Sequence, residues 1–480
     1  MSGTINLPAA FLDRMERLLG IEYGEFLRSY GQERHYGLRY NPLKASAEEF
    51  EKKMPFALES VSWAREGYYY QAGDQPGKHI LHEAGAYYIQ EPSAMAVTEI
   101  LDPQPGEYIL DLCAAPGGKS THIAGRMAGE GLLVSNEIIP GRAKILSRNV
   151  ERMGIKNCVV CNETPERMAA FFPNYFDRIV VDAPCSGEGM FRKDETAVTE
   201  WSEAHVSMCA DRQYGIITEA ARMLRPGGVL VYSTCTFAPE EDEGVVSRFV
   251  REHEEFFIED VAHDGAFVQG RREWVEDPAD GIEHTMRLMP HKLKGEGHYI
   301  ARLRRREIFS GSSVRWEGGV NGWPVEAKRD GARKGDRHAW SISPDGIRDF
   351  LTGELGLPAD WTKRQDGVIQ IFGEQIYLVP RAMVSMQGMK VVRAGLHLGT
   401  DKKNRIEPSH ALALALSIEE TDRKMELTEQ EAERYLRGES LSCVSGKGWI
   451  LLTYMGYPLG FGKAVNGQVK NHYPKGLRIM

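Results

Sequence analysis

Short apolar runs alternate with stretches of helical periodicity along the middle of the chain, from about residue 91 to residue 305. The apolar runs predict strands at residues 108–112, 132–135, 158–160, 178–182, 228–232 and 299–303. Strands separated by helices are typical of βαβ units, which build a mostly parallel sheet with helices on both faces. The pattern over 91–305 therefore predicts an α/β core with a doubly wound sheet.

The N-terminal region shows a different pattern. Apolar residues recur at helical spacing between Pro8 and Gly20, with charged residues on the opposite face. This pattern predicts an amphipathic helix and argues against a signal peptide. Helix-like stretches then mix with aromatic and turn-rich segments, so residues 1–90 are expected to form a small α+β module.

The C-terminal third loses the βαβ alternation. Residues 306–340 combine basic residues and glycine with little apolar periodicity, which predicts a basic linker. Within residues 341–480, the first part up to residue 380 is expected to be a small bridging unit. From residue 381 onward the pattern predicts a compact, strand-rich module with one helix near residues 428–437.

Length and composition narrow the class of protein. The 480 residues suffice for two to four domains, and 42% hydrophobic with 26% charged residues is usual for soluble globular proteins. No apolar run approaches the roughly 18–20 residues that a membrane span requires, so no membrane partner is expected. Seven cysteines are too few and too scattered for a disulfide framework, which indicates a reducing, cytoplasmic compartment. The only CxxC pair, Cys158 and Cys161, lies in a predicted strand, and no metal site is expected there.

Charge is unevenly distributed along the chain. The total is −9, yet residues 381–480 carry 15 Lys and Arg against 10 Asp and Glu. Basic and aromatic residues interleave from Gly462 to Arg478, as on a surface that follows a phosphate backbone. An RNA-binding surface and an ordinary solvated basic face both fit this tail.

The segment 108–121 has the form strand, small-residue turn and helix start, which is typical of a nucleotide-binding loop. A P-loop would require glycine where the chain has Cys113, and a dinucleotide fingerprint would require a third glycine after Gly117. Glu137 follows the next predicted strand, where a carboxylate can accept the ribose hydroxyls of an adenosine cofactor. A ribose without a phosphate cradle suggests S-adenosylmethionine, and Asp111 is placed to fix its ammonium group or a water beside it. A loop that merely turns remains an alternative.

Two cysteines follow predicted parallel strands. Cys185 lies in Asp182-Ala-Pro-Cys185, and Cys235 lies in Ser-Thr-Cys235-Thr. The carboxyl ends of such strands are the edge where ligands bind, so both thiols are candidates for chemistry, although buried cysteines are more often structural. A thiolate that adds to carbon 6 of cytosine makes carbon 5 nucleophilic toward a methyl donor. Asp182 is placed to act as the acid that stabilises charge on the ring nitrogens.

These motifs resemble those of the Sun/Fmu-type RNA 5-methylcytosine methyltransferases, most closely the bacterial RsmF-type enzymes. The matching segments, in chain order, are 90–93, 111–119, 182–187, 233–236, 395–399 and 470–476. The resemblance implies a Rossmann-like, class I S-adenosylmethionine methyltransferase core at 91–305, an N-terminal RNA-recognition-like module, and a C-terminal PUA-like β-rich RNA-binding domain. It further implies 16S rRNA or the 30S subunit as partner. Because a multi-domain chain would carry its own RNA-binding modules, we expect it to work as a monomer.

The resemblance also assigns roles by position. Cys235 would be the nucleophile that attacks carbon 6, and Cys185 would help to resolve the covalent adduct. Lys119 would lie beside the target base, and Asp182 would serve both cofactor and cytosine. The implied cofactor-binding residues are Cys113, Ala114, Ala115, Pro116, Gly117, Gly118, Lys119, Glu137 and Asp182. One position departs from the family, since Thr164 stands where many relatives have an Asp near the adenine.

Two other functions remain open from the sequence. A non-catalytic ribosome-assembly factor would bind RNA on the same modules but would not need two thiols and Asp182. An RNA methyltransferase with tRNA as substrate would share every motif. A DNA cytosine methyltransferase is disfavoured, because such enzymes attack with the cysteine of the Pro-Cys motif and do not need Cys235.

Overall fold

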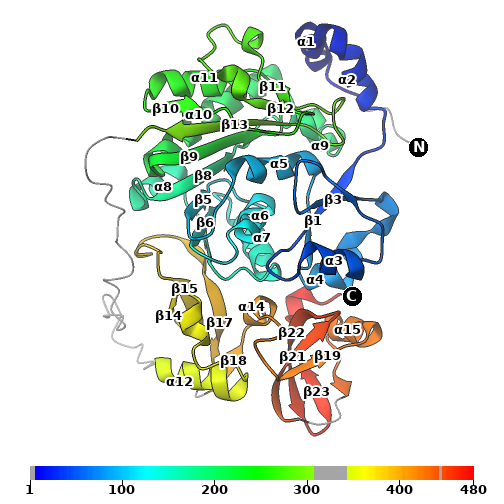
Figure 1. Ribbon diagram of the computed structural model, residues 1–480, viewed down its shortest axis with the longest axis vertical. Coiled ribbons are helices and arrows are strands. Elements are labelled where there is room, and N and C mark those ends of the chain that lie inside the picture. The colour runs from blue at the N-terminus through cyan, green and yellow to red at the C-terminus, as the bar shows by residue number, and fades with distance from the viewer. Residues whose placement is uncertain (1–5, 308–342, 404, 443–445, 480) are drawn as a thin grey trace.

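The computed structural model describes residues 6–307, 343–403, 405–442 and 446–479, and the expected basic linker at 306–340 lies almost wholly outside them. Figure 1 shows a central α/β layer, with α1 and α2 at one end of the molecule and two strand-rich units at the other. Among the described residues, no helix is long and apolar enough to cross a membrane.

The expected N-terminal amphipathic helix is confirmed. Helix α1 (Ala9–Leu19) begins after Pro8 and ends at Gly20, whose φ of +52° favours glycine. Helix α2 (Tyr23–Ser29) follows, and Phe11 and Phe26 from the two helices pack in one apolar cluster with Trp201 of the α/β core. This helical pair is therefore anchored to the core.

The rest of the N-terminal region forms a four-stranded antiparallel sheet with the order β2-β3-β1-β4. Its elements are β1 (Tyr36–Tyr40), α3 (Ala47–Lys53), β2 (Glu59–Ser60), β3 (Gly67–Tyr70), α4 (Ile80–Glu83) and β4 (Tyr87–Ile89). Helix α3 begins with a capping box in which Ser46 and Glu49 satisfy each other's backbone N–H groups. The predicted mixture of helix and strand is thus present.

The central sheet has ten strands, and its predicted members all form. The strands are β5 (Tyr108–Asp111), β6 (Leu132–Asn136), β7 (Cys158–Cys161), β8 (Phe176–Asp182), β9 (Leu224–Thr234), β10 (Phe256–Ile258), β11 (Val268–Gln269), β12 (Met286–Leu288), β13 (His298–Arg305) and β16 (Val391–Ala394). Strands β9, β8, β5, β6 and β7 are mutually parallel, and β13 is antiparallel to β9. The centre of the sheet is therefore parallel, as predicted, but β10, β11, β12, β13 and β16 all pair antiparallel, so the sheet as a whole is mixed and the expectation of a mostly parallel sheet holds only for its centre.

Helices cover both faces of this sheet and bury one apolar cluster on each side. One face is covered by α5 (Pro92–Leu101), α6 (Gly118–Arg126) and α7 (Pro140–Arg152). The other is covered by α8 (Pro165–Phe171), α10 (Glu203–Met223) and α11 (Glu243–Glu252), and α9 (Glu195–Glu200) lies at the periphery. This is the doubly wound arrangement expected of the core.

The C-terminal third contains two further sheets. The first has the order β14-β15-β17-β18, and the second has the order β19-β21-β22-β23-β20. Their strands are β14 (Gly367–Phe372), β15 (Gln375–Pro380), β17 (Leu396–Asp401), β18 (Ile406–Pro408), β19 (Lys424–Glu426), β20 (Leu441–Ser442), β21 (Gly448–Tyr454), β22 (Tyr457–Val465) and β23 (Gln468–Asn471). The helices are α12 (Pro344–Asp349), α13 (Trp361–Arg364), α14 (His410–Ala415) and α15 (Glu429–Leu436).

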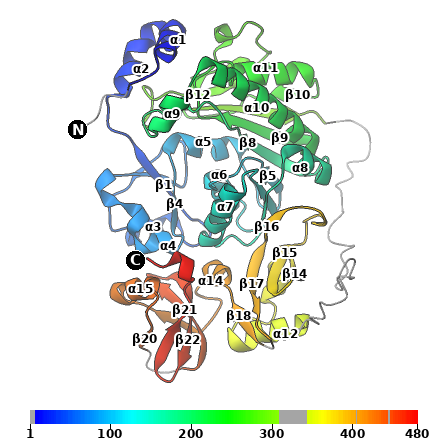
Figure 2. The same cartoon turned by 180° about the vertical axis from the view of Figure 1, so that it is seen from behind.

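The predicted helix near 428–437 is confirmed as α15, but the expected start of the strand-rich module at residue 381 is wrong. Strand β15 pairs with β17 across that position, so the first sheet begins at residue 367. The segment between these two strands contains β16, which pairs with β7 at the edge of the central sheet and not with the C-terminal strands. Figures 1 and 2 show the same strand-rich units below the core from both sides.

The two ends of the chain share an apolar core. One cluster joins Leu38 and Tyr87 of the N-terminal sheet to Tyr435 of α15 and Leu452 of the last sheet. The Tyr473 hydroxyl donates a hydrogen bond to Glu83 at 3.2 Å across the same boundary. The C-terminus accordingly lies beside α4 in Figure 1.

Candidate active site

The predicted functional residues meet at one edge of the central sheet. Strands β6, β5, β8 and β9 are adjacent and parallel, so their carboxyl ends lie in a row. Glu137 follows β6, the loop 112–117 follows β5, Asp182 ends β8, and Cys235 follows β9. This edge is where sheets of this class bind ligands.

The loop after β5 turns directly into α6. Gly117 has a φ of +112°, and a Cβ there would lie 3.1 Å from Leu146 Cδ1, so only glycine suits both the backbone and the space. The Ala114 N–H donates to the Asn136 carbonyl at 2.8 Å, which ties the loop to the end of β6. Residues 113–117 therefore form a turn beside the end of β6, and residues 118 and 119 begin α6.

Two buried carboxylates flank this turn. Asp111 accepts a hydrogen bond from Ser120 Oγ at 2.6 Å through Oδ2, while its Oδ1 is buried without a partner among the described residues. Burial raises the pKa of Asp111 to about 7. Glu137 is 3% exposed, and its Oε1 accepts the Ile139 N–H at 2.9 Å. An unsatisfied carboxylate oxygen and a second acid on the next strand fit a cofactor with an ammonium group and a ribose.

The N-terminal module supports the cofactor loop. Arg39 is buried, and its Nη2 donates to the Gly118 carbonyl at 2.7 Å and to Thr121 Oγ1 at 3.1 Å. Its Nε donates to Gln90 Oε1, directly before α5. The first turn of α6 is thus held in place from β1.

Asp182 and Lys119 form a tight ion pair at the centre of the site. Lys119 Nζ lies 2.6 Å from Asp182 Oδ2, and Ser233 Oγ donates to Asp182 Oδ1 at 2.9 Å. Burial alone would raise the pKa of Asp182, but Lys119 and His298 outweigh it and hold that pKa well below its usual range. Asp182 is therefore ionised at neutral pH in this arrangement, and its predicted role as the acid that stabilises charge on the ring nitrogens stays a prediction.

The two predicted cysteines meet. Cys185 Sγ lies 3.3 Å from Cys235 Sγ, and both side chains are half-buried. The loops that carry them are joined by the Gly189 N–H, which donates to the Cys235 carbonyl at 2.8 Å, and by a 2.8 Å hydrogen bond between Ser186 and Thr236 hydroxyls. Contact with the Cys235 thiol, together with burial, raises the pKa of Cys185 well above its usual value. Cys185 is therefore a protonated thiol beside Cys235.

Two glutamates that the sequence analysis missed brace the cysteine loops. Glu188 is fully buried and accepts hydrogen bonds from Arg14 of α1, from Trp201 Nε1 at 2.8 Å and from the Phe237 N–H at 3.1 Å. Glu241 accepts the Ser186 N–H at 2.9 Å through Oε2, and its Oε1 is buried without a partner in the described part of the chain. Their partners lie 13 to 174 residues away and in other elements, so no local motif marks them.

Thr164, which departs from the family pattern, has a structural role. Its Oγ1 accepts the Arg167 N–H at 3.4 Å and caps α8. The preceding Glu163 is buried and pairs with Arg167 at 2.6 Å. These partners give no reason to place either side chain against the adenine.

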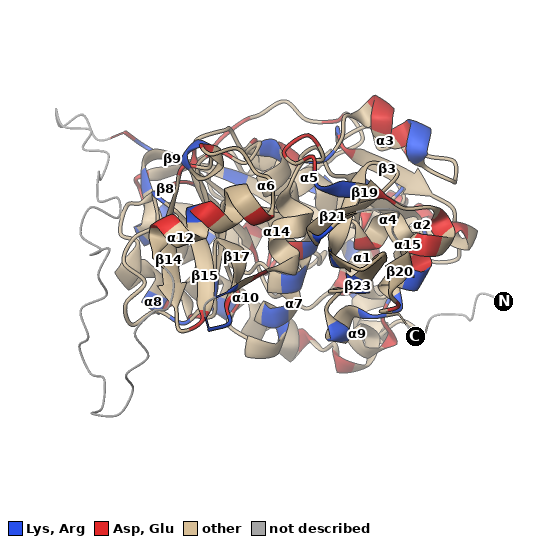
Figure 3. Ribbon diagram, turned by 90° about the horizontal axis from the view of Figure 1, so that it is seen from below, with Lys and Arg blue, Asp and Glu red and all other residues tan. Residues whose placement is uncertain are grey.

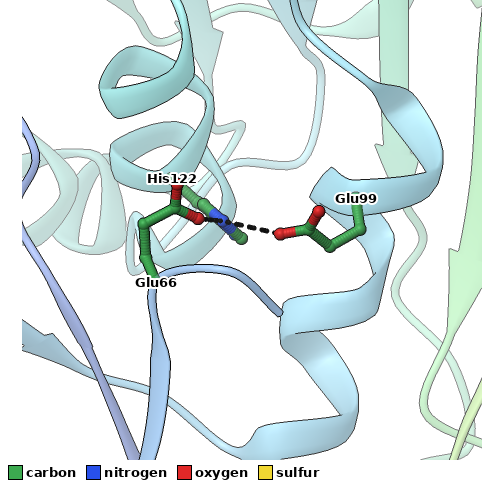
Figure 4. Close-up of side chains that lie close together, drawn as sticks. All are labelled: Glu66, Glu99 and His122. Carbon is green, nitrogen blue, oxygen red and sulfur yellow. Dashed lines mark hydrogen bonds and ion pairs between the residues drawn. The ribbon is translucent and has the colours of Figure 1, made fainter. Parts of the chain in front are cut away.

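A second cluster with metal-ligand chemistry lies between the N-terminal sheet and the core (Figure 4). His122 Nε2 lies 3.0 Å from Glu66 and 3.7 Å from Glu99. Arg126 already pairs with both carboxylates, and burial lowers the pKa of His122 to about 3. Because the guanidinium compensates the acids, we assign the cluster to an ion-pair network that ties the N-terminal sheet to α5 and α6.

Comparison with protein families matches nearly the whole described chain. Residues 98–304 match the family described as 16S rRNA methyltransferase RsmB/F, and residues 7–92 match the N-terminal domain of 16S rRNA methyltransferase RsmF. Residues 356–416 match the first C-terminal domain of RsmF rRNA methyltransferase, and residues 422–479 match the methyltransferase RsmF PUA domain. The α/β core with an N-terminal module and a C-terminal PUA domain is thereby confirmed.

Individual relatives agree over their full length. The ribosomal RNA small subunit methyltransferases F of Vibrio parahaemolyticus and Vibrio vulnificus are each 30% identical over 99% of this chain and 98% of their own. Among solved structures, a methyltransferase homolog from Pyrococcus horikoshii has 26% identity and a TM-score of 0.56 over 63% of this chain and 96% of its own. NSun6 from the same organism, solved with SFG, shares the fold at 23% identity, with a TM-score of 0.54 over 63% of this chain and 100% of its own.

Proposed function

The chain belongs to the RsmF-type 16S rRNA methyltransferases of the Sun/Fmu family, and on that basis we propose that it methylates carbon 5 of a cytosine in 16S rRNA. The methyl donor would be S-adenosylmethionine. The observation that carries the proposal is the 3.3 Å approach of the Cys185 and Cys235 thiols beside the Lys119–Asp182 ion pair. A protein that only binds RNA has no need for this arrangement.

The cofactor would be held at the ends of β5 and β6. The proposed binding residues are 113–119, Glu137 and Asp182, with the free oxygen of Asp111 available for the ammonium group. S-adenosylmethionine supplies an electrophilic methyl group when it is bound. The buried Glu137 carboxylate would accept ribose hydroxyl hydrogens, which fixes the orientation of the nucleoside part.

Catalysis would begin with the Cys235 thiolate. Its sulfur forms a bond to carbon 6 of the flipped cytosine, and the electron pair of the carbon 5–carbon 6 double bond makes carbon 5 nucleophilic. Lys119 carries the positive charge of the ion pair with Asp182. Its ammonium group would donate a hydrogen bond to the cytosine ring as negative charge develops on that ring. Asp182 stays a carboxylate, positions Lys119 and accepts hydrogen bonds from the cytosine amino group.

Release of the product would use the second thiol. After methylation, loss of the carbon-5 proton to a base restores the double bond and expels the Cys235 thiolate. Cys185 remains protonated because its pKa is raised, and it can donate its S–H to the departing sulfur 3.3 Å away. This contact supports a role for Cys185 in resolving the adduct.

We further propose that residues 1–90 and 341–480 contact the RNA around the target and that the chain acts as a cytoplasmic monomer, with 91–305 as the catalytic domain and 306–340 as a connector.

The test of the proposed methylation is nucleoside analysis by mass spectrometry after incubation with S-adenosylmethionine. Naked 16S rRNA, 30S subunits and tRNA are compared as substrates, and Cys209→Ala serves as a control thiol on α10. We expect 5-methylcytidine in 16S rRNA or 30S subunits. A methyl group only in tRNA, or only at another atom, would reject the proposed substrate or reaction.

A further inference from the structure

A cavity of about 830 Å³ lies outside the catalytic site, between α12 and the last sheet. Figure 3 looks onto the end of the molecule that carries α12 and β23, with the charged residues coloured. The charged lining residues from the side of β18, β22 and β23, called the basic wall below, are Arg405, Lys463 and Lys470, with Glu407 among them. The charged lining residues from α12 and the turn after it are Asp349 and Glu354. None of these residues belongs to the active site described above.

The basic wall carries three positive groups and one carboxylate, Glu407, which pairs with His472. Lys463 on β22 lies directly opposite Lys470 on β23, a cross-strand pairing of like charges that destabilises a sheet. Within the described residues, no carboxylate lies within 4 Å of either ammonium group or of the Arg405 guanidinium. An anion seated between these groups would remove the repulsion.

An aromatic side chain forms the base of this wall. Trp449 is 5% exposed, and Lys463 Nζ lies 5.0 Å from its ring centroid. His472 packs edge-on against the same ring at 4.5 Å, and its Nδ1 lies 3.2 Å from Glu407 Oε1. Lys463 is thus held in place by an aromatic platform, whereas an ordinary surface lysine would move freely.

The opposite wall decides what kind of anion fits. Asp349 and Glu354 bring negative charge to the same cavity, so a small free anion such as phosphate meets repulsion as well as attraction. A nucleotide carries a negative phosphate at one end and hydrogen-bond donors on its base at the other. Its two ends match the two walls, and the cavity volume lies in the range of roughly 300–1,000 Å³ typical of small-ligand sites.

We propose that this cavity binds one nucleotide of the RNA substrate outside the target cytosine. Its phosphate contacts Arg405, Lys463 and Lys470, and its base edge faces Asp349 and Glu354. The inference rests on the proposed function for the identity of the RNA, and it adds a contact site in the C-terminal third of the chain. Such a contact would fix the RNA while the target base occupies the catalytic pocket.

The test measures binding of a short fluorescent single-stranded RNA of mixed sequence to the full chain at several salt concentrations. The variants are Lys463→Ala, Lys470→Ala and their combination. The matched control is the double variant Lys447→Ala with Lys475→Ala, which removes the same charge from exposed positions outside the cavity. Thermal unfolding of every variant verifies the fold.

We expect the combined cavity variant to weaken RNA binding about tenfold and to reduce the salt slope by at most roughly 0.7, the value for one phosphate on a single strand. Each single variant should lose less than the combined variant, because the remaining lysine still contacts the same phosphate. The control should change affinity less than about twofold. Equal and additive losses in the cavity and control variants would overturn the proposal, since they indicate a diffuse basic surface.

A second arm separates a nucleotide site from an anion site. Asp349→Asn combined with Glu354→Gln should weaken binding of RNA and of mixed free nucleoside monophosphates, yet strengthen competition by inorganic phosphate. Weaker competition by phosphate in this variant would overturn the proposal. The readout is RNA binding, so the outcome is independent of methylation. A wild-type chain that fails to methylate RNA rejects the proposed function alone. Cavity variants that bind RNA as tightly as wild type reject this inference alone.

Discussion

Glu241 is a buried carboxyl group, and burial disfavours its charged form. Burial raises the pKa of Glu241 to about 7, against an ordinary value of 4.5. Between pH 4.5 and about 7, the folded chain therefore binds more protons at Glu241 than the unfolded chain does. The contribution of Glu241 to the free energy of unfolding falls as pH rises through this range. Glu241→Gln removes the titration and keeps the shape.

We therefore predict that Glu241→Gln gains stability relative to wild type as pH increases from 5 to 8, by roughly 2–4 kcal/mol at most. The measurement is urea unfolding at several pH values. A difference between variant and wild type that stays constant with pH would show that the Glu241 carboxyl does not titrate in this range.

Asp111 has the same direction of pKa shift but a different consequence. If its ionised form holds the cofactor ammonium group, S-adenosylmethionine affinity should increase about tenfold from pH 6 to pH 8, because the pKa of Asp111 is about 7. Calorimetric titration measures the affinity. Asp111→Asn should bind weakly at every pH, and a wild-type affinity that is independent of pH would contradict this role.

At the scale of elements, α1 is coupled to the catalytic loops through one ion pair. Arg14→Leu would leave the fully buried Glu188 without its guanidinium, and breaking a buried pair in this way costs about 3–5 kcal/mol. We expect lower thermal stability together with reduced methyl transfer, because Glu188 also holds the Phe237 N–H after Cys235. Arg17→Leu, at an exposed position of the same helix, should leave both unchanged, and equal effects of the two variants would refute the coupling.

The elements and the site were predictable to different degrees. Buried parallel strands such as β8 and β9 contain continuous apolar runs, and the ends of these strands place Asp182 and Cys235 at the ligand-binding edge without further information. The edge strand β16 and the pairing of β15 with β17 depend on partners far away in sequence, so no local pattern reveals them. Arg39 and Glu188 were missed for the same reason, and the charge state of Asp182 required the position of Lys119.

At the scale of the whole molecule, the first and last sheets stabilise each other. Tyr473 is 2% exposed, packs against Tyr435 and His410, and donates to Glu83 of α4. Tyr473→Ala should cost about 3–5 kcal/mol, whereas Tyr473→Phe keeps the ring and should cost only about 1 kcal/mol. Hydrogen exchange would show the effect of Tyr473→Ala in β1 and β4 as well as in β22. Faster exchange confined to the last sheet would show that the two modules are energetically independent.

The central claim is that the adjacent thiols form and resolve a covalent adduct with cytosine. The most direct measurement is denaturing gel electrophoresis of the full chain incubated with S-adenosylmethionine and labelled 16S rRNA, for wild type, Cys185→Ala, Cys235→Ala and the double variant. The account predicts that Cys185→Ala accumulates a protein–RNA adduct and that the adduct disappears when Cys235 is also replaced. An adduct that persists without Cys235, or a Cys235→Ala variant that still methylates the RNA, would contradict it.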